Sequence, residues 1–327
     1  MNEHQHGIRL ERAAAMLRIG MGLVFVIGGL SKLSQLLGPA QAHDAMVAQY
    51  LGGLGYINAP FQQYLFFEGS PLSPSVFLTL LSSFELVSGI ALLVGLFVRP
   101  LALFYGLLLW TFVVSLPTHT VPGGAQGIAT YTSPAIFVQI RDIALSGMMF
   151  VLFNLGAGAR SLDQRLFPHV VAVRWEPLGV LLRVSLGIVF IVAGFFGGFA
   201  HIATFGATPW LLAPIGLALI FGGPKVVRAG GVAAIAVFVW FVAHKLNLSM
   251  SVIANLNGFK REFALAAAAA VLVLYGGGES FTLRDLLRRA GSYRGRRIDR
   301  SLILSRHHSH REGNTAHRSR NRGIHAS

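Results

Sequence analysis

Among the charged residues within or beside apolar segments that are long enough to cross a membrane, four could do chemistry: Lys32, Glu85, Arg141 and Asp142. Glu85 occurs in the segment SSFELVSGIALLVGL (82–96), about 15 Å from the outer end of its helix at a rise of about 1.5 Å per residue. A charge at that depth costs roughly 2.5–3.5 kcal/mol. The carboxyl group must therefore be protonated or paired with a cation inside the bundle. A functional site is the usual reason for such a residue, and the alternative is a protonated acid that only cross-links helices.

Arg141 and Asp142 are adjacent in the sequence, so their side chains point in different directions and need partners on other helices. We expect Asp142 to pair with Lys32 and Arg141 with Glu85. The alternative is that this cluster reaches out to the membrane surface. The same outward reach explains Arg18 and Arg183, which lie near the cytoplasmic ends of their predicted helices.

The composition is that of a helical membrane protein with several spans. Of the 327 residues, 54% are hydrophobic and 12% are charged, about half the charged fraction of an average soluble protein. No cysteine is present, which excludes thiol catalysis and disulfides. We see no metal-ligand spacing and assign no metal site. The apolar segments predict eight transmembrane helices, at about residues 13–31, 75–97, 101–117, 135–156, 177–199, 209–222, 227–246 and 252–276.

The basic residues predict the orientation. With the N-terminus in the cytoplasm, twenty-two of the 27 Lys and Arg residues lie on the cytoplasmic side, as the positive-inside rule requires. Twelve of them follow residue 283, in a tail rich in Ser, His and Gly that we expect to be disordered after an initial helix. We expect the tail to contact anionic lipid, and a nucleic-acid arm is the alternative. Both termini are therefore predicted to be cytoplasmic.

The eight helices divide into two copies of a four-helix unit. RIGMGLVFVIGG (18–29) repeats as RVSLGIVFIVAG (183–194), and RDIALSG (141–147) repeats as REFALAA (261–267). Because each unit has an even number of spans, the two copies are parallel. We predict an all-α fold of two such bundles, with a first module at 1–166, a degenerate second module at 167–290 and a tail at 291–327. Lys32 and Glu85 align with Gly197 and Leu212, so the first half is expected to carry the site.

The residues of the first half resemble the DoxX/DoxD family. The resemblance rests on RIGMGLVFVIGGLSKL (18–33), FELVSGIALLVGLFVRPLAL (84–103) and RDIALSGMMFVLFNLGAGARSLDQRL (141–166). It implies a four-helix module in a bacterial inner membrane, in a family whose members include a membrane subunit of thiosulfate:quinone oxidoreductase. The tandem arrangement and the long basic tail depart from the usual single module.

Two classes of function follow from the residues together with this resemblance. The first is a quinone-linked redox subunit with no resident cofactor, in which Glu85 and Asp142 carry protons as catalytic residues and Lys32 and Arg141 bind an anionic substrate such as thiosulfate. The second is a non-catalytic anchor that holds a periplasmic or membrane redox partner through the outer segment 34–74. A proton-coupled transporter is a third alternative.

Overall fold

The structure is a computed structural model that describes residues 3–51, 57, 59–115, 120–121, 130–131, 133–167, 173–195 and 211–288. The chain divides into two units, residues 1–280 and 281–327. The predicted tail (291–327) and Gly197 lie outside the described residues.

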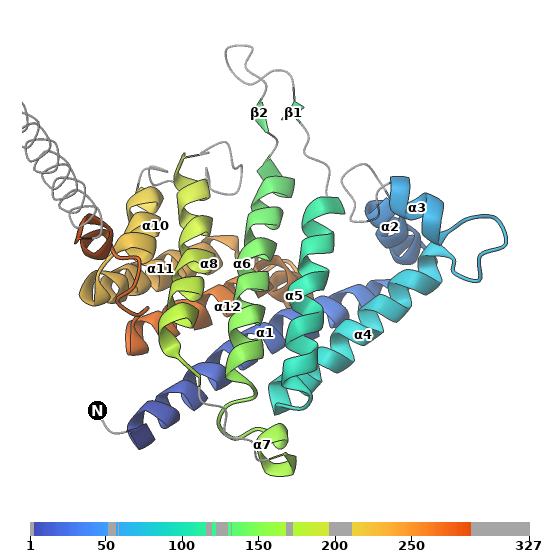
Figure 1. Cartoon of the computed structure of the whole chain (residues 1–327). Coiled ribbons are helices and arrows are strands. Elements are labelled where there is room, and N and C mark those ends of the chain that lie inside the picture. The colour runs from blue at the N-terminus through green and yellow to red at the C-terminus, as the bar shows by residue number, and fades with distance from the viewer. Residues whose placement is uncertain are drawn as a thin grey trace, which may run out of the picture. The chain divides into compact units, whose positions relative to one another are not determined.

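The described part of the first unit is helical apart from two short paired strands. Its helices are α1 (Glu3–Leu36), α2 (Ala40–Leu51), α3 (Ala59–Leu65), α4 (Pro74–Val94), α5 (Val98–Ser115), α6 (Ser133–Leu155), α7 (Leu162–Leu166), α8 (Trp175–Phe195), α10 (Leu212–Phe221), α11 (Pro224–Lys245) and α12 (Val252–Tyr275). The strands β1 (Thr120–Val121) and β2 (Thr130–Tyr131) are antiparallel. Each of the eight predicted segments overlaps one helix, in order α1, α4, α5, α6, α8, α10, α11 and α12, shown along the chain in Figure 1.

Four helices in the described part of the chain are long and apolar enough to cross a membrane: Gly7–Leu36, Pro74–Val94, Trp175–Gly194 and Pro224–Lys245. The protein is therefore a membrane protein. The apolar helices at Val98–Thr111 and Leu212–Phe221 are shorter, and α6 and α12 carry the Arg-acid pairs. That α5, α6, α10 and α12 also cross the membrane remains a prediction.

The helices of the two halves pack in the same pattern, the first against the second and the third against the fourth. In the first half α1 packs against α4 and α5 against α6, while in the second half α8 packs against α10 and α11 against α12. Between the halves, α1 packs against α12 and α6 against α8. One hydrophobic core runs through both halves, from Leu17 on α1 to Leu272 on α12.

Close approach of the helices depends on small residues, as is usual in membrane bundles. A Cβ atom built on Gly22 would lie 3.1 Å from the carbonyl oxygen of Gly89, and one on Gly187 would lie 3.0 Å from that of Gly216. Gly22 and Gly89, in the contact between α1 and α4, thus correspond to Gly187 and Gly216, in the contact between α8 and α10. At Gly20, an added Cβ would lie 2.7 Å from Cβ of Ala267 on α12.

Gly89→Ala is expected to destabilise the protein by about 1–3 kcal/mol, because overpacking forces the backbones apart. An added Cβ at Gly89 would lie 2.7 Å from the backbone nitrogen of Val26 on α1, and backbone cannot rotate away as a side chain can. The midpoint of thermal unfolding in detergent measures the effect. Gly7→Ala is the matched control, since nothing lies within 4 Å of its added Cβ. A midpoint for Gly89→Ala equal to that of the control would contradict the packing described above.

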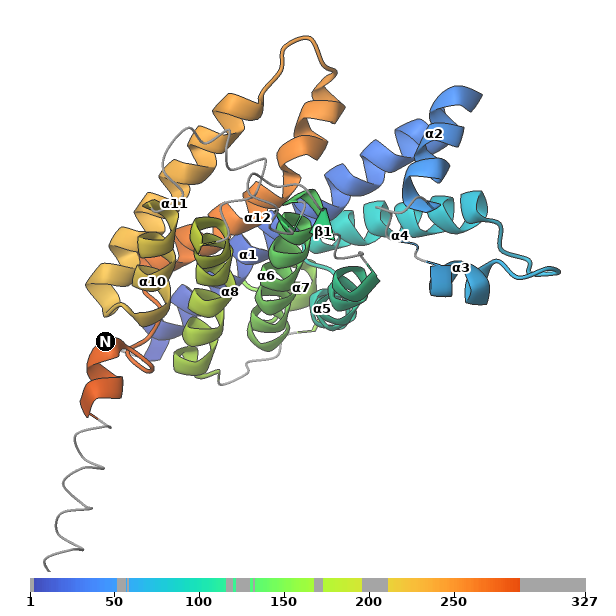
Figure 2. The ribbon, with the colours of Figure 1, turned by 90° about the horizontal axis from the view of Figure 1, so that it is seen from above.

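The connection between α1 and α4 folds into a small structure of its own. Figures 1 and 2 show α2 and α3 gathered beside the C-terminal end of α1 and the N-terminal end of α4. A second, smaller core contains Leu36, Met46, Ile57 and Leu78. Nε2 of His43 is hydrogen-bonded to Oγ of Ser75 at 2.6 Å, which ties α2 to the first turn of α4.

Candidate functional site

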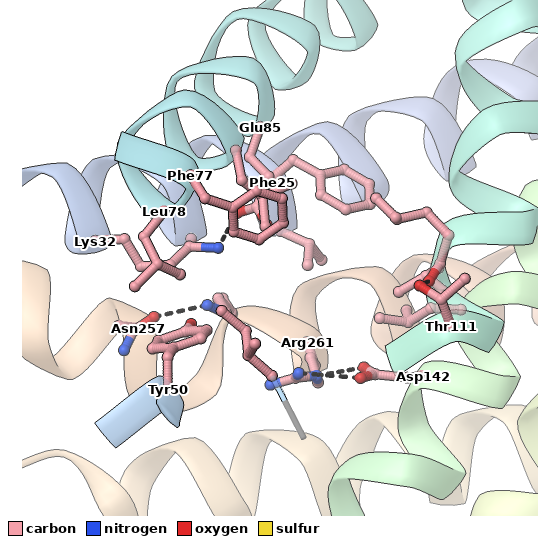
Figure 3. Close-up of a pocket in the computed structure, with 18 of the residues that line it drawn as sticks. Phe25, Lys32, Tyr50, Phe77, Leu78, Glu85, Thr111, Asp142, Asn257 and Arg261 are labelled. Carbon is pink, nitrogen blue, oxygen red and sulfur yellow. Dashed lines mark hydrogen bonds and ion pairs between the residues drawn. The ribbon is translucent and has the colours of Figure 1, made fainter. Parts of the chain in front are cut away.

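A cavity of about 340 Å³ lies between the first-half helices and α12. Its described lining comes from α1, α2, α4, α5 and α6 of the first half, from Ile57 and Leu65, and from α12 of the second half. Figure 3 shows Lys32 and Glu85 beside Phe25 and Phe77, with Tyr50, Asn257 and Arg261 facing them. The polar residues of the described lining are Lys32, Gln49, Tyr50, Glu85, Thr111, Asp142, Asn257, Lys260 and Arg261.

Glu85 forms an ion pair with Lys32 across the cavity wall, through Oε2 and Nζ. Glu85 lies in the middle of α4 and Lys32 near the C-terminal end of α1, and both are buried. Figure 3 shows this contact from the two helices. Since burial removes both charges from water, the pair stabilises itself only by its mutual attraction. The expectation that Glu85 is paired inside the bundle is met, but its partner is Lys32 and not Arg141.

The two Arg-acid motifs form reciprocal ion pairs between α6 and α12. Arg141 pairs with Glu262, and Arg261 donates from Nε to Oδ1 of Asp142 (2.7 Å) and from Nη2 to Oδ2 (3.3 Å). The predicted pairings of Asp142 with Lys32 and of Arg141 with Glu85 are therefore wrong. The physical reason is the order of the helices: α12 supplies Arg261 and Glu262 to the two residues of α6, while Lys32 on α1 and Glu85 on α4 pair with each other. All four side chains are at most about a sixth exposed.

Lys32, Glu85 and Asp142 line the same cavity, whereas Arg141 is not in its described lining. The structure therefore brings together three of the four residues singled out from the sequence. Asp142 has both oxygens bonded to Arg261, and Glu85 meets the single ammonium group of Lys32. Of the two carboxylates, Glu85 is less tightly held and is better suited to exchange a proton.

The remaining wall is apolar and partly aromatic. Val24, Leu78, Leu81 and Leu108 line it together with Phe25 and Phe77. The ring of Phe25 stacks on Tyr105, with centroids 3.6 Å apart, and the hydroxyl group of Tyr105 is hydrogen-bonded to Ser88 on α4. The stacking on Tyr105 thus fixes the orientation of the Phe25 ring. An apolar wall opposite a few placed polar groups is the usual form of a small-molecule site.

Tyr50 on α2 covers one side of the cavity. Nζ of Lys32 lies 6.0 Å from the centroid of its ring, within reach of a cation–π contact. Burial raises the pKa of the Tyr50 phenol, and the nearby Lys32 ammonium opposes that effect only in part. Tyr50 therefore stays neutral at physiological pH and can donate a hydrogen bond from its hydroxyl group.

Arg18 and Arg183 do not reach out to the membrane surface as expected, since both are buried. Arg18 donates to the carbonyl groups of Leu92 and Leu93, at the end of α4. Arg183 donates to Ser280 at 2.7 Å, beyond the end of α12. Terminal carbonyl groups of a helix lack partners within the helix, and an arginine with five N–H donors satisfies several of them at once.

Sequence reasoning missed the contribution of the second half. Asn257, Lys260 and Arg261 line the cavity from α12, although the second half was expected to act mainly as scaffold. The signal was present: Lys260, Arg261 and Glu262 are charged residues within an apolar segment. The alignment of the two halves hides this signal, because the aligned counterparts of Glu85 and Lys32 are apolar or glycine.

Comparisons with known proteins support the assignment of the first half. No curated protein and no solved structure matches the chain. Residues 13–116 match the family model described as DoxX. This region contains α1, α4 and α5, and with them Lys32 and Glu85. This match supports a relationship to the DoxX family for residues 13–116.

Proposed function

We propose that the protein is the membrane subunit of a quinone-linked redox system and that the cavity between the first-half helices and α12 binds the quinone. The observation that carries the proposal is the Lys32–Glu85 pair, set within spanning helices in a cavity whose apolar lining includes Phe25 and Phe77. A quinone ring suits the aromatic and apolar wall, and its two carbonyl oxygens suit the N–H donors on the other side.

Reduction of a quinone to a quinol consumes two electrons and two protons. The Lys32–Glu85 pair holds one exchangeable proton next to the cavity, and general acid catalysis by such a group requires only hydrogen-bond reach. The second proton comes from water, which also restores the proton of the pair. Glu85 then has the catalytic role, Asp142 holds Arg261 in place, and Lys32 binds a quinone oxygen. The electrons come either from a small anionic reductant such as thiosulfate or from a redox partner.

The proposed location is the bacterial inner membrane, with both termini in the cytoplasm. Arg18 lies in the middle of α1 and Arg183 in the middle of α8, and they donate to carbonyl groups at the end of α4 and beyond the end of α12. Lys32, Lys260 and Arg261, which the sequence places on the outer side, line a single cavity. This segregation agrees with the positive-inside rule and supports the lipid membrane as the first partner of the chain.

We further propose that the two halves arose by duplication of one four-helix module. Three features support this: the reciprocal packing of α1 on α12 and of α8 on α6, the equivalent glycine contacts at Gly22 and Gly187, and the crossed pairing of the two Arg-acid motifs. In a dimer of single modules the same motif would pair with its own copy.

The function is tested by quinone reduction in membranes that contain the full chain, with thiosulfate or a cell extract as electron source. We expect donor-dependent reduction of a soluble quinone analogue above that of membranes without the protein. Membranes that reduce no quinone while the purified protein retains a soluble partner would contradict the proposal. That result would favour the alternative, a non-catalytic anchor, and loss of the partner on deletion of segment 37–73 would then identify the docking segment.

A further inference from the structure

The described residues that line the cavity carry more positive than negative charge. The cations are Lys32, Lys260 and Arg261, and the carboxylates are Glu85 and Asp142. Lys32 pairs with Glu85 and Arg261 pairs with Asp142. The ion pairs of the described residues thus account for both carboxylates and leave the charge of Lys260 unmatched.

A hydrogen bond to an uncharged side chain holds Lys260 in place. Its Nζ donates to Oδ1 of Asn257, one turn earlier on α12, at 2.7 Å. Figure 3 labels Asn257 and draws this bond as a dashed line. An ammonium group has three N–H donors, so one bond to a neutral amide oxygen leaves capacity for a ligand. The unmatched charge is costly in an apolar surrounding, and a negatively charged ligand would remove that cost.

The ammonium group of Lys260 lies against a glycine of α1. A Cβ atom built on Gly28 would lie 3.0 Å from Nζ of Lys260 and 3.5 Å from Oε2 of Glu85. The ammonium group of Lys260 and the Lys32–Glu85 pair therefore share one side of the cavity, at the surface that Gly28 leaves open. A ligand atom placed there meets the proton-exchanging pair and the unmatched cation together.

We propose that Lys260 makes the cavity selective for quinones that carry one negative charge on a ring oxygen: acidic hydroxyquinones and the deprotonated reduced form. The inference rests on the proposed quinone site and adds the charge of the ligand that the site prefers. Lys260 binds the ionised oxygen and balances its charge, while the apolar wall holds the ring. The second half of the chain thereby supplies the residue that sets specificity.

The test compares two probes of similar size on the purified full chain. Hydroxynaphthoquinone is ionised at neutral pH, and methoxynaphthoquinone has the same ring but no acidic group. Their dissociation constants are measured by quenching of tryptophan fluorescence. We expect the hydroxyquinone to bind roughly tenfold or more tightly than the methoxyquinone, as is typical of a hydrogen bond to a charged group.

The variants separate the charge of Lys260 from its packing. Lys260→Gln and Lys260→Met are expected to bind both probes about equally, and Lys260→Arg to keep the preference. Lys245→Gln is the control. Lys245 is also a lysine of the second half, with Nζ 5.1 Å from the centroid of the Phe241 ring, but it is not part of the described lining. It should keep the preference of the wild type.

The outcomes distinguish this inference from the proposed function. Equal binding of the two probes by the wild type, or a preference that persists in Lys260→Gln and Lys260→Met, would overturn the role of Lys260 while leaving the quinone site intact. Failure of both probes to bind the wild type would overturn the quinone site itself, and the inference with it.

Discussion

Glu85→Gln is expected to lower quinone reduction per folded molecule roughly a hundredfold or more, the typical contribution of a general acid or base. Glutamine keeps the shape of the side chain and can still accept a hydrogen bond from Lys32, but it cannot exchange a proton. The measurement is the initial rate of donor-dependent reduction of a quinone analogue by membranes, divided by the amount of monodisperse protein extracted from them.

Glu262→Gln is the matched control for this experiment. Glu262 is also a buried acid paired with one cation, Arg141, but it is not among the described residues of the cavity lining. Both variants remove a carboxylate charge that faces a buried cation, so their effects on stability should be similar. Only Glu85→Gln should lose turnover per folded molecule. Equal turnover of the two variants would remove Glu85 from the mechanism.

Arg141→Leu is expected to destabilise the protein by about 3–5 kcal/mol, because it leaves the carboxylate of Glu262 buried and unpaired. Loss of one partner of a buried ion pair costs more than loss of both, since the remaining charge has no water and no cation to stabilise it. The effect is measured as the shift of the unfolding midpoint in detergent.

The double variant Arg141→Leu with Glu262→Leu should recover most of the lost stability, because two apolar side chains then face each other. Arg165→Leu, at an exposed position of α7, should change stability by no more than about 0.5 kcal/mol. If the double variant is as unstable as Arg141→Leu alone, α6 and α12 do not meet through this pair.

The helices could largely be predicted from the sequence, because apolar segments of spanning length are a direct consequence of the membrane's thickness. The repeat of 18–29 as 183–194 aligns Gly22 with Gly187, and in the structure these two glycines make equivalent contacts, with Gly89 and Gly216. The short helices α2 and α3 could not be predicted in the same way. Their small core, around Met46 and Ile57, forms only because Leu36 and Leu78 are brought together by the packing of α1 on α4.

The candidate site was predicted in its residue types but not in its pairings. The cost of an isolated charge in lipid correctly singled out Lys32, Glu85, Arg141 and Asp142 as residues needing partners. Which residue pairs with which depends on the order of helices around the bundle, and periodicity along a helix carries no information on that order. The contribution of Lys260 and Arg261 was missed for the same reason: a site shared between the halves is invisible until α12 is placed beside α1 and α6.

Photochemical labelling tests the quinone site most directly. The purified full chain is irradiated with a quinone that carries a photoreactive group on its ring, and the labelled peptides are identified by mass spectrometry. We predict labels on α1 near Phe25, on α4 near Leu81 and on α12 near Lys260, all reduced by excess unlabelled quinone. Labels confined to the exposed apolar positions of α4 and α11, such as Val87 and Val239, and unaffected by competitor would contradict the proposed site.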